Sequence, residues 1–167
     1  MADITVRKIR FAFDESWDLD ASPQELATTL PALGLSLTMP YLEPYLIRTM
    51  KVAIKQIEDP ALVEDARRFS QQEGHHYRNH AVFNEQVRDH FGAETATRIR
   101  GIEEALEADY QRFTREKSLR FNLAYAEGFE ALTTASARFS FERGADPNLH
   151  PQVAALYSWH LVEELEH

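Results

Sequence analysis

Apolar residues recur at helical spacing over most of the chain. Between residues 93 and 115, for example, Ile99, Ile102, Leu106 and Tyr110 fall on one stripe of a helix. Proline and glycine separate the periodic segments from one another. The predicted helices cover approximately residues 23–34, 36–57, 60–90, 93–115, 118–143 and 151–167.

The boundaries of these segments carry recognisable signals. Pro31 and Gly34 are expected to end the first helix, and Asp59 followed by Pro60 is a typical helix start. Gly92 and Gly144 stand where helices are expected to end. Residues 1–20 alternate apolar and charged side chains, which predicts an extended strap lying on the domain. Since nothing in the sequence resembles an interdomain linker, residues 1–167 are predicted to form one all-α domain.

Composition and charge exclude several classes of function. Of 167 residues, 18 are Lys or Arg and 27 are Asp or Glu, so the formal net charge is −9. This acidic balance argues against binding of nucleic acids or of anionic membranes. The sequence has no cysteine, which excludes disulfides, thiolate metal sites and cysteine nucleophiles. No long apolar run predicts a membrane span, and we expect a cytoplasmic protein.

Two predicted helices carry the sequence Glu-x-x-His. Glu73 and His76 form the first pair, and Glu164 and His167 form the second. Side chains three residues apart share one face of a helix, so each pair can bind a single metal ion. One such pair is weak evidence, because it arises readily by chance.

Two further glutamates complete a larger pattern. Glu43 lies in an apolar stretch before the first pair, and Glu130 lies on the predicted helix between the two pairs. Glu127, one turn before Glu130, is the less favoured alternative. One glutamate from each of two helices and one Glu-x-x-His from each of two others make up the dinuclear site of ferritin-like bundles. The pattern predicts a ferritin-like four-helix bundle, in which the polar helix 93–115 is the crossover between the second and third ligand-bearing helices.

Further polar residues lie on the same helical stripes. His80 follows His76 by four residues, and His160 precedes Glu164 by four. Each histidine is a candidate ligand, a partner of a ligand, or a core residue with its own hydrogen bonds. Glu163 either orients His167 or faces solvent. In a hydrolytic reaction His80, His160 or Glu163 could serve as the general base.

The sequence around these residues resembles a bacterial family of predicted metal-dependent hydrolases. Gln72 to His80, with Asn84 nearby, is similar to its Gln-Glu-x-x-His-x-x-x-His segment, and Trp159 to His167 is similar to its Trp-His-x-x-Glu-Glu-x-Glu-His segment. The resemblance implies a ferritin-like fold with a dinuclear site. It also implies that members continue beyond the last motif. The ligands that it implies are Glu43, Glu73, His76, Glu130, Glu164 and His167.

Three functions are compatible with such a site. The pattern favours an enzyme with two divalent ions, iron above manganese or zinc, that acts as an oxidase or oxygenase on a small organic substrate with O₂. The first alternative is a dinuclear metal-dependent hydrolase. The second is iron storage or metal buffering without catalysis. The expected partner is a small molecule, and a homodimer is possible.

Overall fold

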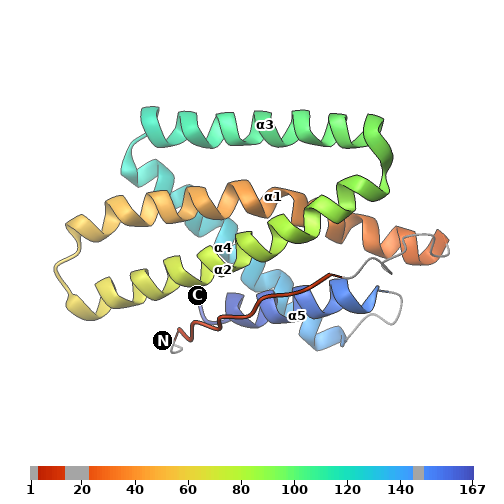
Figure 1. Ribbon diagram of the computed structural model, residues 1–167. Helices are drawn as coiled ribbons and strands as arrows, with labels where there is room; N and C mark the ends of the chain where they lie inside the picture. The colour runs from red at the N-terminus through yellow and green to blue at the C-terminus, as the bar shows by residue number, and fades with distance from the viewer. Residues whose placement is uncertain (1–3, 14–22, 145–148) are drawn as a thin grey trace.

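The computed structural model describes residues 4–13, 23–144 and 149–167. Residues 23–144 and 149–167 are mostly helical, residues 4–13 form no helix, and no β-strand lies in the described ranges (Figure 1). The elements are α1 (Pro23–Ala53), a 3₁₀ turn η1 (Ile54–Gln56), α2 (Pro60–His90), α3 (Gly92–Glu116), α4 (Leu119–Arg143) and α5 (Pro151–Glu164). The all-α prediction is therefore confirmed. None of the described helices is long and apolar enough to cross a membrane.

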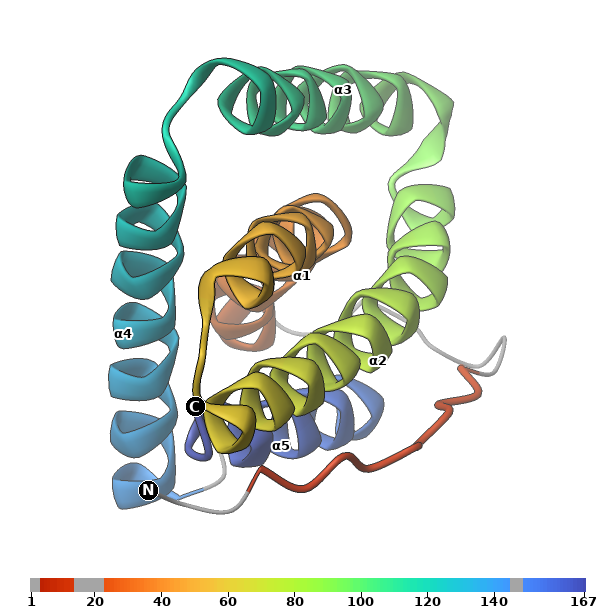
Figure 2. The same ribbon diagram turned by 90° about the vertical axis from the view of Figure 1, so that its left-hand side faces the viewer.

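The predicted break near Pro31 and Gly34 is wrong. α1 is one helix that continues through Pro31, Pro40 and Pro44. Each proline inside a helix costs about 3 kcal/mol, because it removes one backbone hydrogen bond and crowds the preceding turn. α1 lies at the centre of the molecule, with α2, α3 and α4 around it (Figure 2). Burying several of its large side chains at about 1.5–3 kcal/mol each offsets that cost.

The other helices begin and end close to the predicted positions. The Asp59 side chain accepts a hydrogen bond of 2.8 Å from the backbone N–H of Ala61 and so caps α2. Gly92 and Gly144 have φ angles of 75° and 80°, a left-handed backbone that favours glycine. These glycines explain the turn between α2 and α3 and the end of α4. α5 ends at Glu164, three residues earlier than predicted.

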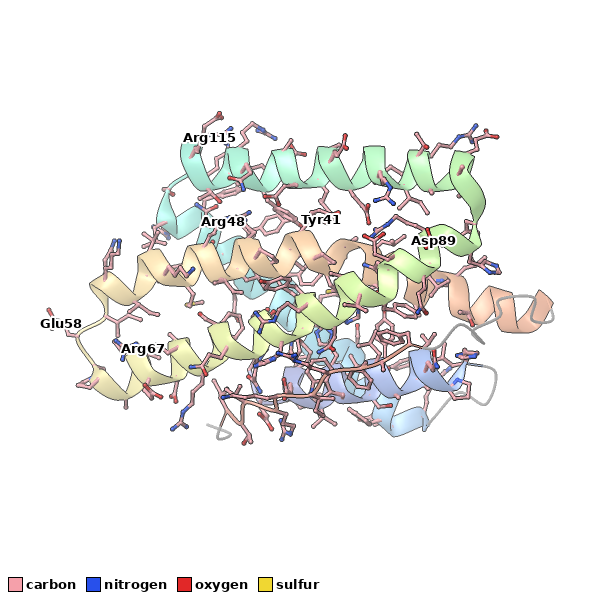
Figure 3. The ribbon with its side chains drawn as sticks, viewed as in Figure 1. Tyr41, Arg48, Glu58, Arg67, Asp89 and Arg115 are labelled. Carbon is pink, nitrogen blue, oxygen red and sulfur yellow. The ribbon has the colours of Figure 1, made fainter. Side chains whose placement is uncertain are left out.

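α3 packs along α1 and α2. Arg88 of α2 and Glu103 of α3 form a buried ion pair of 2.5 Å, and Arg48 of α1 lies 3.5 Å from Glu107 of α3. Tyr41 and Arg48 extend from α1 toward α3 (Figure 3). In the chain, α3 separates α2 from α4, and its role as a ferritin-type crossover stays a prediction. Its polar contacts attach it firmly to the central helix.

The described part of the predicted strap, residues 4–13, lies along α2 and α5 (Figure 1). Asn79 of α2 binds it at two points. Its amide nitrogen donates to the Ile9 carbonyl at 3.0 Å, and its amide oxygen accepts from the Phe11 N–H at 3.0 Å. Phe11 also packs against Trp159 of α5. The strap therefore joins the two helices that carry the Glu-x-x-His motifs.

Candidate metal centre

Four helices direct carboxylates and imidazoles into one buried region. α1 contributes Glu43, α2 contributes Glu73 and His76, α4 contributes Glu130, and α5 with the residues after it contributes His160, Glu164 and His167. Glu43, Glu73, His76 and Glu164 are each at most 3% exposed. Charged residues are buried this completely only when a partner compensates for the lost water.

The seven side chains form two groups that are each suited to one metal ion. In the first group, ligand atoms of Glu43, His76 and His160 lie within 4.8 Å of one another. In the second group, atoms of Glu73, Glu130, Glu164 and His167 meet the same limit. The groups adjoin, because His76 Nδ1 lies 3.8 Å from an oxygen of Glu73 and 3.8 Å from an oxygen of Glu164. The arrangement can therefore hold two neighbouring ions.

Several atoms of these groups lack a hydrogen-bond partner in the described part of the chain. They are both carboxylate oxygens of Glu43, Oε1 of Glu73, Nδ1 of His76 and Oε2 of Glu164. Each unpaired buried polar group costs about 1–3 kcal/mol. Because all five atoms belong to the two groups, bound cations would satisfy them together. The donor set of carboxylates and imidazoles suits iron, manganese or zinc, so the residues fit the metal that the sequence implied.

The electrostatics of the centre point the same way. Burial, together with the charges of neighbouring glutamates, holds the pKa values of Glu43 and Glu73 well above the ordinary range. Burial also tends to raise the pKa of Glu164, but the hydrogen bond and charge of His160 and the other imidazoles lower it to about 2. Four carboxylates in one buried region repel one another, and divalent cations would relieve this repulsion.

The last histidine has an unusual protonation equilibrium. The side chain of His167 is only 4% exposed, although its terminal backbone is open to solvent. Burial tends to lower its pKa, but a 2.8 Å hydrogen bond with Glu130 and the charges of Glu73 and Glu164 raise it to about 9. A positive charge is therefore strongly favoured at this position, where a metal ion would supply one.

Each imidazole in the two groups has one ring nitrogen among the other ligand atoms and the other nitrogen held by a neighbouring residue. The pairs behind the imidazoles are His76 Nε2 with Glu163 at 2.8 Å, His160 Nδ1 with His80 Nε2 at 2.8 Å, and His167 Nε2 with Gln72 Oε1 at 3.0 Å. Metal-binding histidines almost always have such a partner, because it fixes the orientation of the ring.

These contacts change the roles that the sequence suggested for three residues. His160 lies in the first group, beside Glu43 and His76, so its position is that of a ligand. Glu163 and His80 lie behind His76 and His160, where they are poorly placed to act as a base on substrate. Glu163 was expected either to orient His167 or to face solvent, but it is buried and contacts His76. α5 ends at Glu164, so His167 lies outside the helix and the four-residue helical spacing from Glu163 does not reach it.

Sequence reasoning missed two residues that support the centre. Gln72 donates to the Thr5 carbonyl at 3.2 Å and to Glu166 at 2.9 Å, which leaves its oxygen for His167. Its position immediately before Glu73 in the family motif was the available signal. Arg7 lies on the strap and forms ion pairs with Glu163 at 3.3 Å and Glu166 at 2.6 Å. No local pattern identifies Arg7, because its partners are more than 150 residues away in the chain.

A cavity of about 1190 Å³ opens beside the second group. Glu130 and His167 form part of its wall, and many of the other lining residues are apolar. Glu127, the less favoured alternative to Glu130, also lines this cavity and lies outside both groups. The structure therefore places the two candidate glutamates of α4 in different surroundings, Glu130 among the possible ligands and Glu127 on the open wall.

The described helices bring together two adjoining groups of carboxylates and imidazoles that could each hold a metal ion. The chain belongs to the family described as predicted metal-dependent hydrolase, whose model matches residues 5–167. The resemblance found in the motifs is thus confirmed for the family. No curated protein and no solved structure matches the chain, so the ferritin-like relationship stays a prediction.

Proposed function

We propose that this protein is a hydrolase that uses two divalent metal ions. The first ion would be held by Glu43, His76 and His160, and the second by Glu73, Glu130, Glu164 and His167. The observation that carries the proposal is that five buried atoms without a hydrogen-bond partner in the described part of the chain lie within these two groups. Two bound ions polarise a carbonyl and lower the pKa of a water molecule, which is the chemistry that hydrolysis needs.

Hydrolysis replaces oxygen chemistry as the preferred reaction. The residue pattern alone favoured a di-iron oxidase, because carboxylates and histidines suit redox iron. The family description names metal-dependent hydrolysis, and it gives no support to an oxidase. The centre also has three imidazoles, one more than the two Glu-x-x-His motifs supply. Imidazole nitrogen binds zinc as readily as iron, so the ligand set is equally suitable for a metal without redox chemistry.

The cavity suggests the substrate class. Its apolar lining includes Met50, Phe69 and Leu123, and its charged lining includes Asp65, Glu127, Arg138, Glu142 and Glu166. An excess of acidic side chains disfavours a substrate with several negative charges, such as a phosphate ester. We therefore propose an uncharged ester or amide with an apolar group, whose carbonyl lies beside Glu130 and His167.

Glu127 is the residue that we propose as the general base. It lies on the cavity wall one helical turn before Glu130, and it is exposed. Because it belongs to neither ligand group, its carboxylate is available to take a proton from an attacking water. Glu163 and His80 already have hydrogen-bonding partners behind the centre, so they are poorly placed for this role.

Metal content measured by elemental mass spectrometry tests the centre. Protein loaded anaerobically with Zn²⁺, Mn²⁺ or Fe²⁺ and then desalted is expected to retain about two ions per chain. Glu73→Ala and Glu130→Ala should lose most of this metal, while the matched variant Glu127→Ala keeps it. Many more ions per chain would indicate storage, and no retained metal would refute the proposal.

Turnover of neutral aromatic esters and anilides tests the reaction. The rate is expected to be the same with and without O₂ and to disappear after metal removal. Glu127→Gln should lower kcat by about 10²–10⁴-fold at unchanged metal content. Glu142→Gln, a change elsewhere on the cavity wall, should leave kcat unchanged. Consumption of O₂ that depends on an organic substrate would restore the oxidase hypothesis.

A further inference from the structure

We propose that Glu166 is a positioning residue, which the N-terminal strap holds in place so that His167 can bind the second metal ion. The strap is residues 4–13, and we call its contact with Glu166 the latch. The inference rests on the proposed metal centre, and it assigns a role to a residue that belongs to neither ligand group. It follows from how the chain is held after α5 ends.

The chain leaves the helix before it reaches His167. α5 ends at Glu164, and a hydrogen bond of 2.9 Å from the Glu166 N–H to the Glu163 carbonyl closes the last turn. Beyond a helix end, the helical hydrogen-bond ladder no longer fixes the backbone. The position of His167 therefore depends on side-chain contacts, and a metal ligand must be held closely in its productive geometry.

The Glu166 carboxylate accepts three hydrogen bonds. Its Oε2 accepts from the backbone N–H of Thr5 at 2.8 Å and from Gln72 Nε2 at 2.9 Å, and its Oε1 accepts from Arg7 Nη2 at 2.6 Å. Thr5 and Arg7 lie on the strap, and Gln72 lies on α2. Hydrogen bonds to a charged acceptor are about twice as strong as neutral ones. They hold the segment after α5 against two separate elements.

The strap that supplies two of these donors is itself anchored to the domain. Gln72, Asn79 and Gln86 follow one another at seven-residue intervals on α2, so they lie on nearly the same side of the helix. The amide nitrogen of each donates to a backbone carbonyl of the strap, at 3.2, 3.0 and 2.8 Å respectively. Phe11 and Phe13 pack against a cluster of buried apolar residues. The strap therefore runs along α2 and α5 as a fixed support (Figure 1).

Gln72 connects the latch to the ligand. Its Nε2 donates to Glu166, and its Oε1 lies 3.0 Å from His167 Nε2. The other ring nitrogen of His167, Nδ1, lies 2.8 Å from Glu130 and 3.7 Å from Glu73 in the second ligand group. Glu166 and the strap thus hold the imidazole where the second ion would bind. Without the latch, ion binding would have to order this segment, and that cost would weaken the affinity.

The latch also has a consequence in the opposite direction. If the held strap strengthens ion binding, a bound ion must hold the strap by the same factor, because the two equilibria are linked. Opening of the strap can be measured at the N–H of Arg7, which donates to Glu163 at 3.2 Å. Because this N–H is not bonded to Glu166, its exchange with solvent reports on the strap itself and not on a bond that a change at Glu166 removes.

The first experiment measures Zn²⁺ affinity of the full chain by competition with a chelator. Glu166→Ala is expected to weaken the binding of one of two ions about tenfold or more, and Glu166→Gln, which keeps an acceptor oxygen, should recover part of the loss. Glu142→Ala is the matched control, because it removes the same charge from the wall of the same cavity and Glu142 is exposed. A Glu166→Ala affinity equal to that of the wild type would overturn the latch.

The second experiment follows amide hydrogen exchange of the wild-type protein and needs no variant to fold. Saturating Zn²⁺ is expected to slow exchange at Arg7 about tenfold or more, a factor similar to the loss of affinity in Glu166→Ala. Phe121, whose N–H donates to Ser118 at the start of α4, should exchange at the same rate with and without Zn²⁺. An Arg7 exchange rate that bound Zn²⁺ leaves unchanged would refute the inference.

Metal-free protein separates a failure of the latch from a failure of the centre. With a chelator present, Glu166→Ala should exchange about tenfold or more faster at Arg7 than the wild type does. If the wild type binds two ions but the metal-free variant exchanges at the wild-type rate, the centre stands and the latch is overturned. If the wild type binds no Zn²⁺, the metal centre is refuted, and with it the purpose that we assign to the latch.

Discussion

The substitution Glu43→Met should change the stability of the metal-free and metal-loaded protein in opposite directions. Glu43 is 2% exposed, and neither of its oxygens has a hydrogen-bond partner among the residues that the structure describes. Met has nearly the same length and no charge, so it should fill the site without a buried unpaired carboxylate. The metal-free variant is therefore expected to be more stable than the metal-free wild type.

The magnitude follows from the cost of the unpaired group. An unsatisfied buried polar group costs about 1–3 kcal/mol, and for a chain of this size 1 kcal/mol shifts Tm by about 2–4 °C. A gain near 2 kcal/mol thus corresponds to about 4–8 °C without metal. With Zn²⁺ at about 100 times Kd, the wild type gains about 2.7 kcal/mol for each site filled. The variant should lose most of the gain from the first group.

The stabilising effect of the substitution should also depend on pH. Because the pKa of Glu43 is raised by burial and by its glutamate neighbours, the folded protein holds this proton more tightly than the unfolded chain. Stability contributed by the protonated carboxyl is therefore lost as pH rises from the unfolded pKa toward the folded pKa. The metal-free variant should gain more over the wild type at pH 8 than at pH 5.

Thermal unfolding followed by circular dichroism measures both effects, with a chelator in one series and Zn²⁺ in the other. The variant should have the higher Tm in chelator, and the wild type should have the higher Tm in Zn²⁺. A variant that is less stable in chelator would show that Glu43 makes favourable contacts without metal. Equal stabilisation of both proteins by Zn²⁺ would show that Glu43 is not a ligand.

Two other substitutions distinguish residues that affect metal binding from residues that affect the stability of the fold. Arg7→Met removes the charge beside Glu163 and should weaken Zn²⁺ binding about tenfold in chelator competition. Arg10 is exposed on the same strap, so the control Arg10→Met should leave Zn²⁺ affinity unchanged. An Arg7→Met affinity equal to that of the wild type would contradict the role of Arg7. Arg88→Met leaves Glu103 buried without its partner and should lower the free energy of unfolding in urea by about 3–5 kcal/mol, while metal content stays at the wild-type value.

Helix positions were predicted well where local signals are strong. Asp59 and Pro60 at the start of α2, and Gly92 and Gly144 at two helix ends, act through their own backbone, so the sequence alone reveals them. Pro31 was misread for the complementary reason. Local sequence favours a break there, and only the packing of three helices around α1 keeps the helix continuous.

The sequence by itself determined the helical class, the family and a set of glutamates and histidines that the structure gathers in one region. Helical periodicity and the spacing within Glu-x-x-His are local properties, so they can be read without a fold. Only the tertiary structure decided that His160 joins Glu43 and His76 and that Glu163 contacts His76. It also decided that Arg7 contacts Glu163 and that Ser36 contacts His80. These pairings depend on how separate helices and the strap rotate against one another, and no local pattern records that rotation.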